Sequence, residues 1–341
     1  MNNFKKIGIS ALAGSLAMVS ATNAVEYAVT GDLIATFSSA NAVPLAEDGK
    51  GIGVDTDLYF NTSGELNNGY TIGMFMGVNT NGALTNSSSQ LTMGMGSLGT
   101  IQINHVGGSK ANAIDDVMPA AYEETWHGIA TDNPSFFGAS VNSGSIDYRI
   151  PAQEFMGTTV NASVTYDPGQ GAGGVDAKDV GATGNSGVAY TLQFAHESGV
   201  EIGGGHEALN DGDIKGGNPT SGETENNTAY IKYATGPFSM GYQAAIKNAA
   251  HGITAKGRDQ EANMMAVAYT SGNTTVSYAE SELINLKHGA SAEVSTELES
   301  VQIAHVMGAM TLSAAVSETK NANATLGQKY EENTLAVSFA F

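Results

Sequence analysis

The segment Phe238-Ser-Met-Gly-Tyr-Gln-Ala-Ala-Ile-Lys247 alternates apolar with polar or small side chains along its whole length. A period of two places the apolar set, which includes Met240, Tyr242 and Ile246, on one face of a β-strand. Strands of globular proteins have about five or six residues, whereas a tilted strand needs about 9–11 residues to cross the hydrocarbon of a bilayer. The length and alternation of this segment therefore predict a membrane-spanning strand.

The same alternation recurs along the chain and gives sixteen predicted strands in all. They run over residues 25–38, 52–61, 70–79, 89–97, 99–106, 144–151, 156–166, 187–197, 200–207, 226–235, 238–247, 262–270, 274–282, 295–306, 310–318 and 331–341. An even number of strands brings both ends of the chain to the same side of the membrane.

The connections between these strands are alternately short and long. Short links contain glycine, as in Ser198-Gly199 and Thr235-Gly236-Pro237. Long links lie near residues 39–50, 107–143, 167–186, 208–225, 248–261, 283–294 and 319–330. Short turns on one side and long loops on the other are typical of outer-membrane barrels. We therefore predict an all-β fold, a 16-stranded antiparallel transmembrane β-barrel with periplasmic turns and external loops.

The first 24 residues have the features of a secretory signal peptide. Lys5 and Lys6 precede a short apolar run, and small residues before Val25 offer a cleavage site, with Ala21 as an alternative. Cleavage would leave residues 25–341 as the barrel and change the formal net charge from -20 to -22. A chain this acidic does not suit nucleic-acid phosphates, which need clustered Lys and Arg. It has no cysteine, so a disulfide framework is excluded.

The two faces of the predicted sheet differ in chemistry. The apolar face carries aromatic residues near strand ends, as interfacial girdles do; these include Tyr27, Phe60, Tyr233, Tyr269 and Phe339. The other face is rich in Ser, Thr, Asn, Gln and Gly, whose polar groups are costly to bury without partners. Because sixteen strands enclose a lumen too wide for side chains to fill, we expect water inside. A soluble β-sandwich would also alternate, but its aromatic residues would gather in a central core.

Several patches resemble Rhodobacter-type (alphaproteobacterial) general porins of Gram-negative outer membranes. They are Leu98-Gly-Thr-Ile-Gln-Ile-Asn104, the segment 113–126, the segments 145–151 and 157–166, and the aromatic C-terminus at Phe341. The resemblance implies a homotrimer of barrels, passive diffusion of small hydrophilic solutes and ions, and a third loop (about 107–143) that folds inward and narrows each pore. It also implies that Phe341 is read by the barrel-assembly machinery, and that lipid and lipopolysaccharide surround the barrel.

An inward third loop would bring four carboxylates to the constriction: Asp115, Asp116, Glu123 and Glu124. Rings of carboxylates favour cations. Arg149, Lys232 and Lys247 have inward parity on the predicted wall, since facing lipid would cost each about 2–4 kcal/mol at the midplane. Three bases are fewer than the basic cluster of general porins. We therefore expect a weak transverse field and a modest preference for cations.

The remaining charged residues suggest weaker hypotheses. Asp32, Asp55 and Asp57 have inward parity and could line the mouth of the pore, while acidic loops at Glu47-Asp48 and Glu223/Glu225 could bind calcium or bridge cations to lipopolysaccharide. We expect no cofactor, no metal centre and no enzymatic activity, because no catalytic signature is present. Two alternatives stay open: a substrate-selective channel on the same barrel, and a surface adhesin or structural barrel that does not conduct.

Overall fold

The computed structural model describes residues 26–43, 49–79, 83–126, 134, 136–138, 141–169, 186–210, 223–248, 259–286 and 294–341. The predicted signal peptide (1–24) lies outside these residues. Within the part of the chain that is described, no helix is long and apolar enough to cross a membrane.

The first half of the sheet comprises β1 (Glu26–Val43), β2 (Gly49–Glu65), β3 (Thr71–Asn79), β4 (Thr85–Gly94), β5 (Thr100–Val106), β6 (Ser145–Arg149), β7 (Gln153–Phe155) and β8 (Thr158–Asp167). The second half comprises β9 (Gly187–His196), β10 (Val200–Asn210), β11 (Glu223–Thr235), β12 (Phe238–Asn248), β13 (Asp259–Ser271), β14 (Thr274–Leu286), β15 (Ser295–Met307), β16 (Met310–Lys320) and β17 (Lys329–Ala340). Among the described residues, the short 3-10 helices are η2 (Gly96–Leu98), η3 (Asn112–Ile114) and η5 (Ala322–Ala324).

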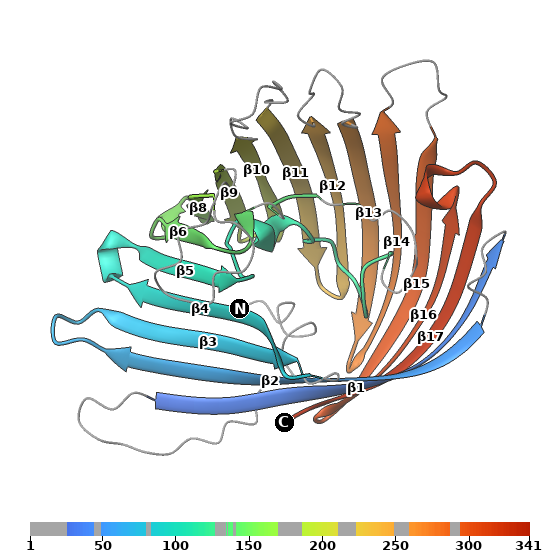
Figure 1. Ribbon diagram of the computed structural model, residues 1–341, viewed down its shortest axis with the longest axis horizontal. Helices are drawn as coiled ribbons and strands as arrows, with labels where there is room; N and C mark the ends of the chain where they lie inside the picture. Colours follow the sequence, from blue (N-terminus) through green and yellow to red (C-terminus); the bar gives the residue numbers. More distant parts are fainter. Residues whose placement is uncertain are drawn as a thin grey trace.

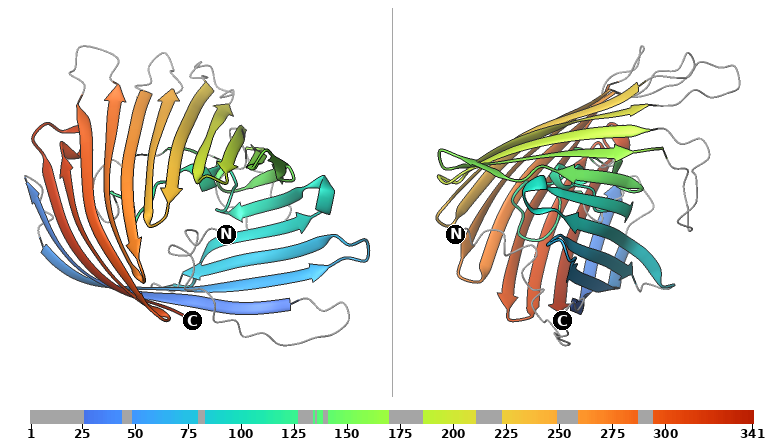
Figure 2. Two further views of the ribbon diagram at one scale, coloured as in Figure 1. Left: turned by 180° about the vertical axis from the view of Figure 1, so that it is seen from behind. Right: turned by 90° about the vertical axis from the view of Figure 1, so that its left-hand side faces the viewer.

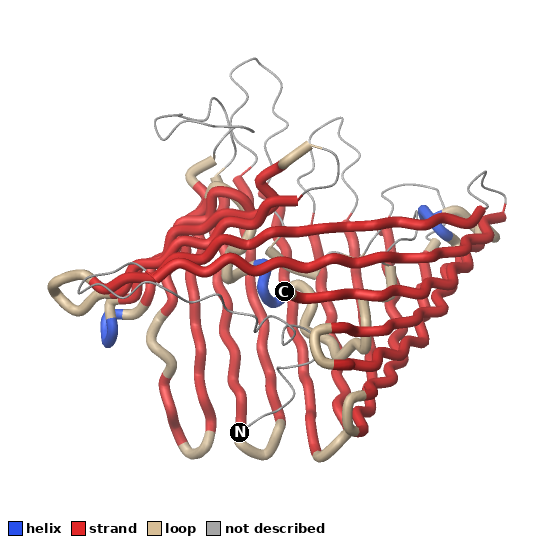
Figure 3. Tube along the Cα trace, turned by 90° about the horizontal axis from the view of Figure 1, so that it is seen from below, coloured by secondary structure: helices blue, strands red, loops and turns tan. Residues whose placement is uncertain are grey.

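The sheet is a closed 16-stranded antiparallel barrel, as predicted (Figures 1 and 3). The short strands β6 and β7 both pair with β8, so they are two parts of one barrel strand. Pro151 interrupts this strand because proline has no backbone N–H to donate. The barrel closes where β1 pairs with β17. There Gly31 and Phe341 exchange two backbone hydrogen bonds, of 2.7 and 2.9 Å.

Side chains alternate between the two surfaces of the barrel, and the large apolar ones are exposed on the outside. Examples on neighbouring strands are Ile231, Met240 and Val267, each 45–48% exposed. At the end where short turns join the strands, the Phe238 and Tyr269 rings lie 4.9 Å apart. Tyr27 and Phe60 form a second ring pair, with centroids 6.4 Å apart. The predicted outward apolar face, with rings near strand ends, is present in the structure.

One predicted connection is wrong, and the outer face carries a charged row that the alternation did not indicate. The expected connection at 39–50 is mostly strand, because β1 continues to Val43 and β2 begins at Gly49. The outward face is also not apolar to the loop end of every strand: Glu280, Glu299, Glu318 and Glu331 stand side by side in register across β14–β17. Lys320 bridges this row, with Nζ 2.9 Å from the Glu299 carboxylate. The apolar band therefore ends lower on these strands than on β12.

Candidate pore and third loop

The link between β5 and β6 turns into the barrel (Figures 1 and 2). Gly107 and Gly108 make the turn, with φ of 60° and 86°, values that favour glycine. Gln90 on β4 donates to the Gly107 carbonyl at 2.9 Å, and Gln102 on β5 donates to the Gly108 carbonyl at 2.9 Å. Inward polar side chains of the wall therefore direct the third loop (residues 107–144) toward the lumen.

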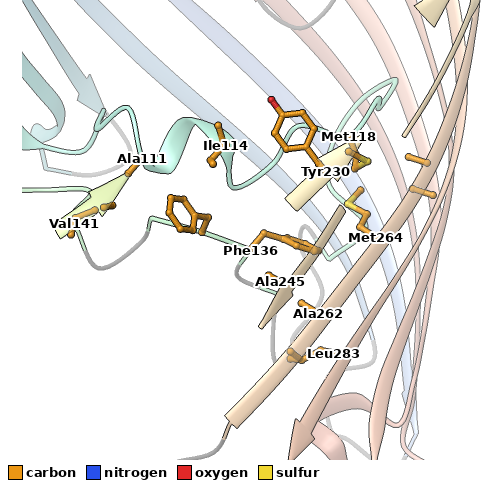
Figure 4. Close-up of a cluster of buried hydrophobic side chains, with 14 residues drawn as sticks. Ala111, Ile114, Met118, Phe136, Val141, Tyr230, Ala245, Ala262, Met264 and Leu283 are labelled. Carbon is orange, nitrogen blue, oxygen red and sulfur yellow. The ribbon is translucent and has the colours of Figure 1, made fainter. Parts of the chain in front are cut away.

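Apolar side chains of the third loop pack against the inner wall and form a dry cluster (Figure 4). The loop contributes Ile114, Phe136, Phe137 and Val141, each with 0% exposure. The wall contributes mainly alanines with larger residues between them: Ala189, Tyr230, Ala245, Ala262, Met264, Ala266, Ala279 and Leu283. Where this cluster lies, side chains of the loop and of the wall fill part of the lumen in which water was expected.

Inward glycines of the wall leave room for these loop side chains. A Cβ added to Gly205 on β10 would lie 2.5 Å from the Phe137 ring, and one added to Gly241 on β12 would lie 2.8 Å from the Met118 sulfur. Atoms of the wall backbone therefore approach the loop more closely than any larger residue would allow. These glycines weaken the strand pattern in the sequence, but they fit the loop to the wall.

The far end of the third loop is held by polar groups of β14 and β15. Gln302 accepts hydrogen bonds from the backbone N–H groups of Tyr122 (2.9 Å) and Glu123 (3.1 Å), and its amide donates to the Glu123 carbonyl at 2.6 Å. Ala121 N–H donates to the Ser277 hydroxyl at 2.9 Å. The loop thus crosses the lumen from β5 to β15, and hydrogen bonds attach it to the wall on both sides.

The four predicted loop carboxylates have different surroundings. Asp115 accepts the backbone N–H groups of Phe136 and Phe137, both at 2.6 Å, so it ties the outgoing loop segment to the returning one. The Asp116 side chain is exposed at its surface, although protein atoms surround it on most sides. The loss of hydration and, second, the negative charge of Glu124 raise the pKa of Asp116 to about 7. Glu123 and Glu124 are half-buried. Of these four carboxylates, Asp116 alone is exposed.

The predicted wall bases are on the same half of the barrel as the loop. The Arg149 guanidinium lies 3.3 Å from the Asp147 carboxylate on β6. Lys232 on β11 lies 3.3 Å from Glu201, beside a cavity of about 520 Å³ under the loop. Lys247 occupies an inward position near the loop end of β12, in register with Asn226 and Gln260. Two of these three bases are therefore neutralised by carboxylates.

The wall that faces the third loop is acidic. Asp32 on β1 and Asp57 on β2 are direct cross-strand partners, and the Tyr59 hydroxyl donates to Asp32 at 2.8 Å. Asp55 accepts from the Asn79 amide at 3.1 Å. Within the described strands β16, β17 and β1–β5, no Lys or Arg occupies an inward position. Parity alone indicated that these aspartates point inward, but it did not indicate that they stand opposite the loop.

Of the loops proposed to bind calcium, Glu47 and Asp48 lie outside the described residues, as does the side chain of Glu223. Among the side chains that are described, no group of three His, Asp or Glu residues is placed to hold a metal ion.

No protein-family model matches the sequence, and no curated protein is similar to it. Solved structures share its fold. Salmonella typhi OmpF, in complex with daunomycin, is 12% identical over 96% of this chain and 100% of that chain, with a TM-score of 0.69. A refined porin structure is 14% identical over 93% of this chain and 100% of the other, with a TM-score of 0.64. A variant of the Rhodobacter blastica porin is 13% identical over 92% and 100%, with a TM-score of 0.54. At these identities the likeness is one of fold.

Proposed function

We propose that this chain is an outer-membrane porin through which small hydrophilic solutes and ions diffuse passively, with a modest preference for cations. The closed barrel, its apolar outer surface and the likeness to porin structures support a channel in the outer membrane of a Gram-negative bacterium. The proposal includes removal of residues 1–24 as a secretion signal and recognition of Phe341 by the barrel-assembly machinery.

One observation carries the cation preference: both sides of the open part of the bore are acidic. Asp116 and the neighbouring glutamates lie on the loop, while Asp32, Asp55 and Asp57 lie on the facing wall. The bases Arg149 and Lys232 are each beside a carboxylate, so these two add little net positive charge to the lumen. Carboxylates that face each other attract cations and repel anions along the same path. A strong transverse field is not expected, because acids have no row of bases opposite them.

The proposal also covers the oligomeric state, the porin subfamily and the contacts of the outer wall. A homotrimer is supported by the fold and by the solved trimer form of Vibrio cholerae OmpT, 11% identical with a TM-score of 0.63. Membership of the Rhodobacter-type porins rests on the sequence patches around 98–104, 113–126 and 145–166. We propose contact with lipopolysaccharide because the apolar outer wall would lie in the outer membrane.

Conductance and solute uptake test the function. Purified protein added to planar bilayers is expected to produce large, steady current steps, and proteoliposomes should swell in isotonic solutions of small uncharged sugars. Absence of steps and of swelling would favour a closed structural barrel. Uptake of one sugar with saturation, but not of others of similar size, would favour the substrate-selective alternative.

A further inference from the structure

The inner wall formed by β1–β3, opposite the third loop, carries acidic, aromatic and hydroxyl side chains on one face. The cross-strand pairs Asp32–Asp57 and Thr30–Tyr59 are adjacent in register, so all four side chains point into the lumen. The Tyr59 hydroxyl lies 2.8 Å from Asp32 Oδ2 and 3.4 Å from Asp57 Oδ2. Tyr59 thereby holds the two carboxylates close together, although their charges repel each other.

The Tyr59 ring, whose hydroxyl contacts both carboxylates, stacks on a second aromatic ring. The rings of Tyr59 and Phe75 are stacked, with centroids 5.8 Å apart and planes 22° from parallel. Gly77 is the cross-strand partner of Tyr59 and has no side chain to separate the rings. Phe75 has no polar atom in its side chain, and yet it occupies an inward, half-buried position on a wall where its neighbours are polar. An apolar ring beside water is stabilised when a solute with an apolar surface covers it.

The wall at this place also has hydrogen-bonding groups without partners. Thr30 is only 7% exposed, and its hydroxyl makes no hydrogen bond. Asp57 Oδ1 is likewise buried and without a partner. Leaving a buried polar atom without a hydrogen bond is unfavourable, because the atom has lost its bonds to water. Two oxygen atoms of the site, Thr30 Oγ1 and Asp57 Oδ1, therefore have acceptor capacity that a donor on a solute could use.

A primary ammonium group supplies such donors. It carries a positive charge and three N–H donors but no acceptor, which suits acceptors on Asp32, Asp57 and Thr30. Aromatic faces attract organic cations through the negative charge density of the ring face. A bare alkali ion would satisfy the carboxylates but would leave the Phe75 ring in water. The combination favours an ammonium group carried on an apolar or aromatic body.

We propose that the pore wall at Thr30, Asp32, Asp57, Tyr59 and Phe75 is a binding site for primary organic ammonium ions. The inference rests on the proposed channel function and gives that channel a preferred solute class. The ammonium group lies between the two carboxylates and the Thr30 hydroxyl, and the organic body lies against the Phe75 ring. No covalent step is involved, and the solute leaves as it entered.

Calorimetric titration of the purified full-length protein in detergent tests binding without relying on conduction. The probes are benzylammonium, methylammonium, which has the charge but no ring, and benzyl alcohol, which has the ring but no charge. Benzylammonium is expected to bind at least fivefold more tightly than either of the other two. Equal affinity for benzylammonium and methylammonium would overturn the role of Phe75, and with it the proposal.

Three variants separate binding from folding. Phe75→Ala should weaken benzylammonium binding about fivefold or more while leaving methylammonium binding unchanged. Thr30→Val removes a hydroxyl that has no partner, so it should leave the thermal unfolding temperature unchanged or raised but weaken ammonium binding. Gln260→Ala, on the distant β13 wall, is the matched control and should bind like the wild type. Unchanged binding in both Phe75→Ala and Thr30→Val would refute the site.

The two proposals fail in distinguishable ways. If the wild type gives steady K⁺-selective current steps but does not bind benzylammonium, the ammonium site is wrong and the channel stands. If it binds benzylammonium but gives no current steps, the site stands and the channel function is wrong. In a conducting channel, benzylammonium should also reduce the K⁺ current, and Phe75→Ala should relieve that block by the same factor as in calorimetry.

Discussion

Replacement of Gln302 by alanine should release the end of the third loop from the wall. Gln302 makes three hydrogen bonds to the loop backbone, at 2.9, 3.1 and 2.6 Å. At about 0.5–1.5 kcal/mol each, their loss weakens attachment by about 3 kcal/mol, which corresponds to a rise of about 100-fold in the detached fraction. The barrel strands themselves keep their hydrogen bonds, so the fold should persist.

The detached fraction can be measured with a thiol probe because the chain has no cysteine of its own. Ala121 is 9% exposed and precedes Tyr122, whose backbone N–H donates to Gln302. A cysteine placed at this position by Ala121→Cys should therefore react with a water-soluble thiol reagent only when this part of the loop detaches from the wall. Adding Gln302→Ala should accelerate the reaction about 100-fold.

Gln260→Ala is the control for this experiment. Gln260 is an inward glutamine on β13, and its amide donates to the Asn285 side chain on β14 at 2.8 Å. An acceleration of less than about threefold in Gln302→Ala, or an equal acceleration in Gln260→Ala, would refute the view that Gln302 anchors the loop.

The remaining predictions concern the loop charge and the glycine contacts. Because the pKa of Asp116 is raised to about 7, the Asp116–Glu124 pair is partly protonated below pH 7 and gains negative charge as the pH rises. The ratio of K⁺ to Cl⁻ permeability should therefore increase between about pH 5.5 and 8.5. Asp116→Asn should remove that increase. The same raised pKa means that the folded loop binds the proton more tightly than the unfolded chain, so loop attachment should weaken as the pH rises through 7, as the thiol probe would report. Gly241→Ala places a Cβ 2.8 Å from the Met118 sulfur and should destabilise loop attachment by about 1–3 kcal/mol, whereas Gly49→Ala, which meets nothing within 4 Å, should not; equal thiol reactivity of these two variants would contradict the fit between loop and wall.

The strands were predictable because lipid on one side and polar groups on the other impose a period of two on the side chains. The strand at 238–247 is an example, since β12 spans Phe238–Asn248. The pattern failed in the outer parts of β1 and β2, where Ser, Ala, Asn and Gly give little contrast between faces. The backbone hydrogen bonds between Ser38 and Gly51, and beyond them, continue regardless of side-chain polarity.

The loop contacts could not be predicted in the same way. Phe136 and Phe137 lie in a segment without periodicity, and nothing in the sequence relates them to Gly205, which is distant along the chain. Asp115 was expected at the pore but bonds the loop backbone instead, a contact that depends on how the loop returns on itself. Parity placed Asp32 and Asp57 inside the barrel; their position opposite the loop depends on which wall the loop contacts.

Acidic groups border the open bore on both sides, and two of the three inward bases, Arg149 and Lys232, are neutralised by carboxylates. The reversal potential of a single channel in a tenfold KCl gradient at pH 7.5 measures this directly. A potential displaced toward the K⁺ equilibrium value, and displaced less in Asp57→Asn, is the expected result. A potential displaced toward the Cl⁻ equilibrium value would contradict the account.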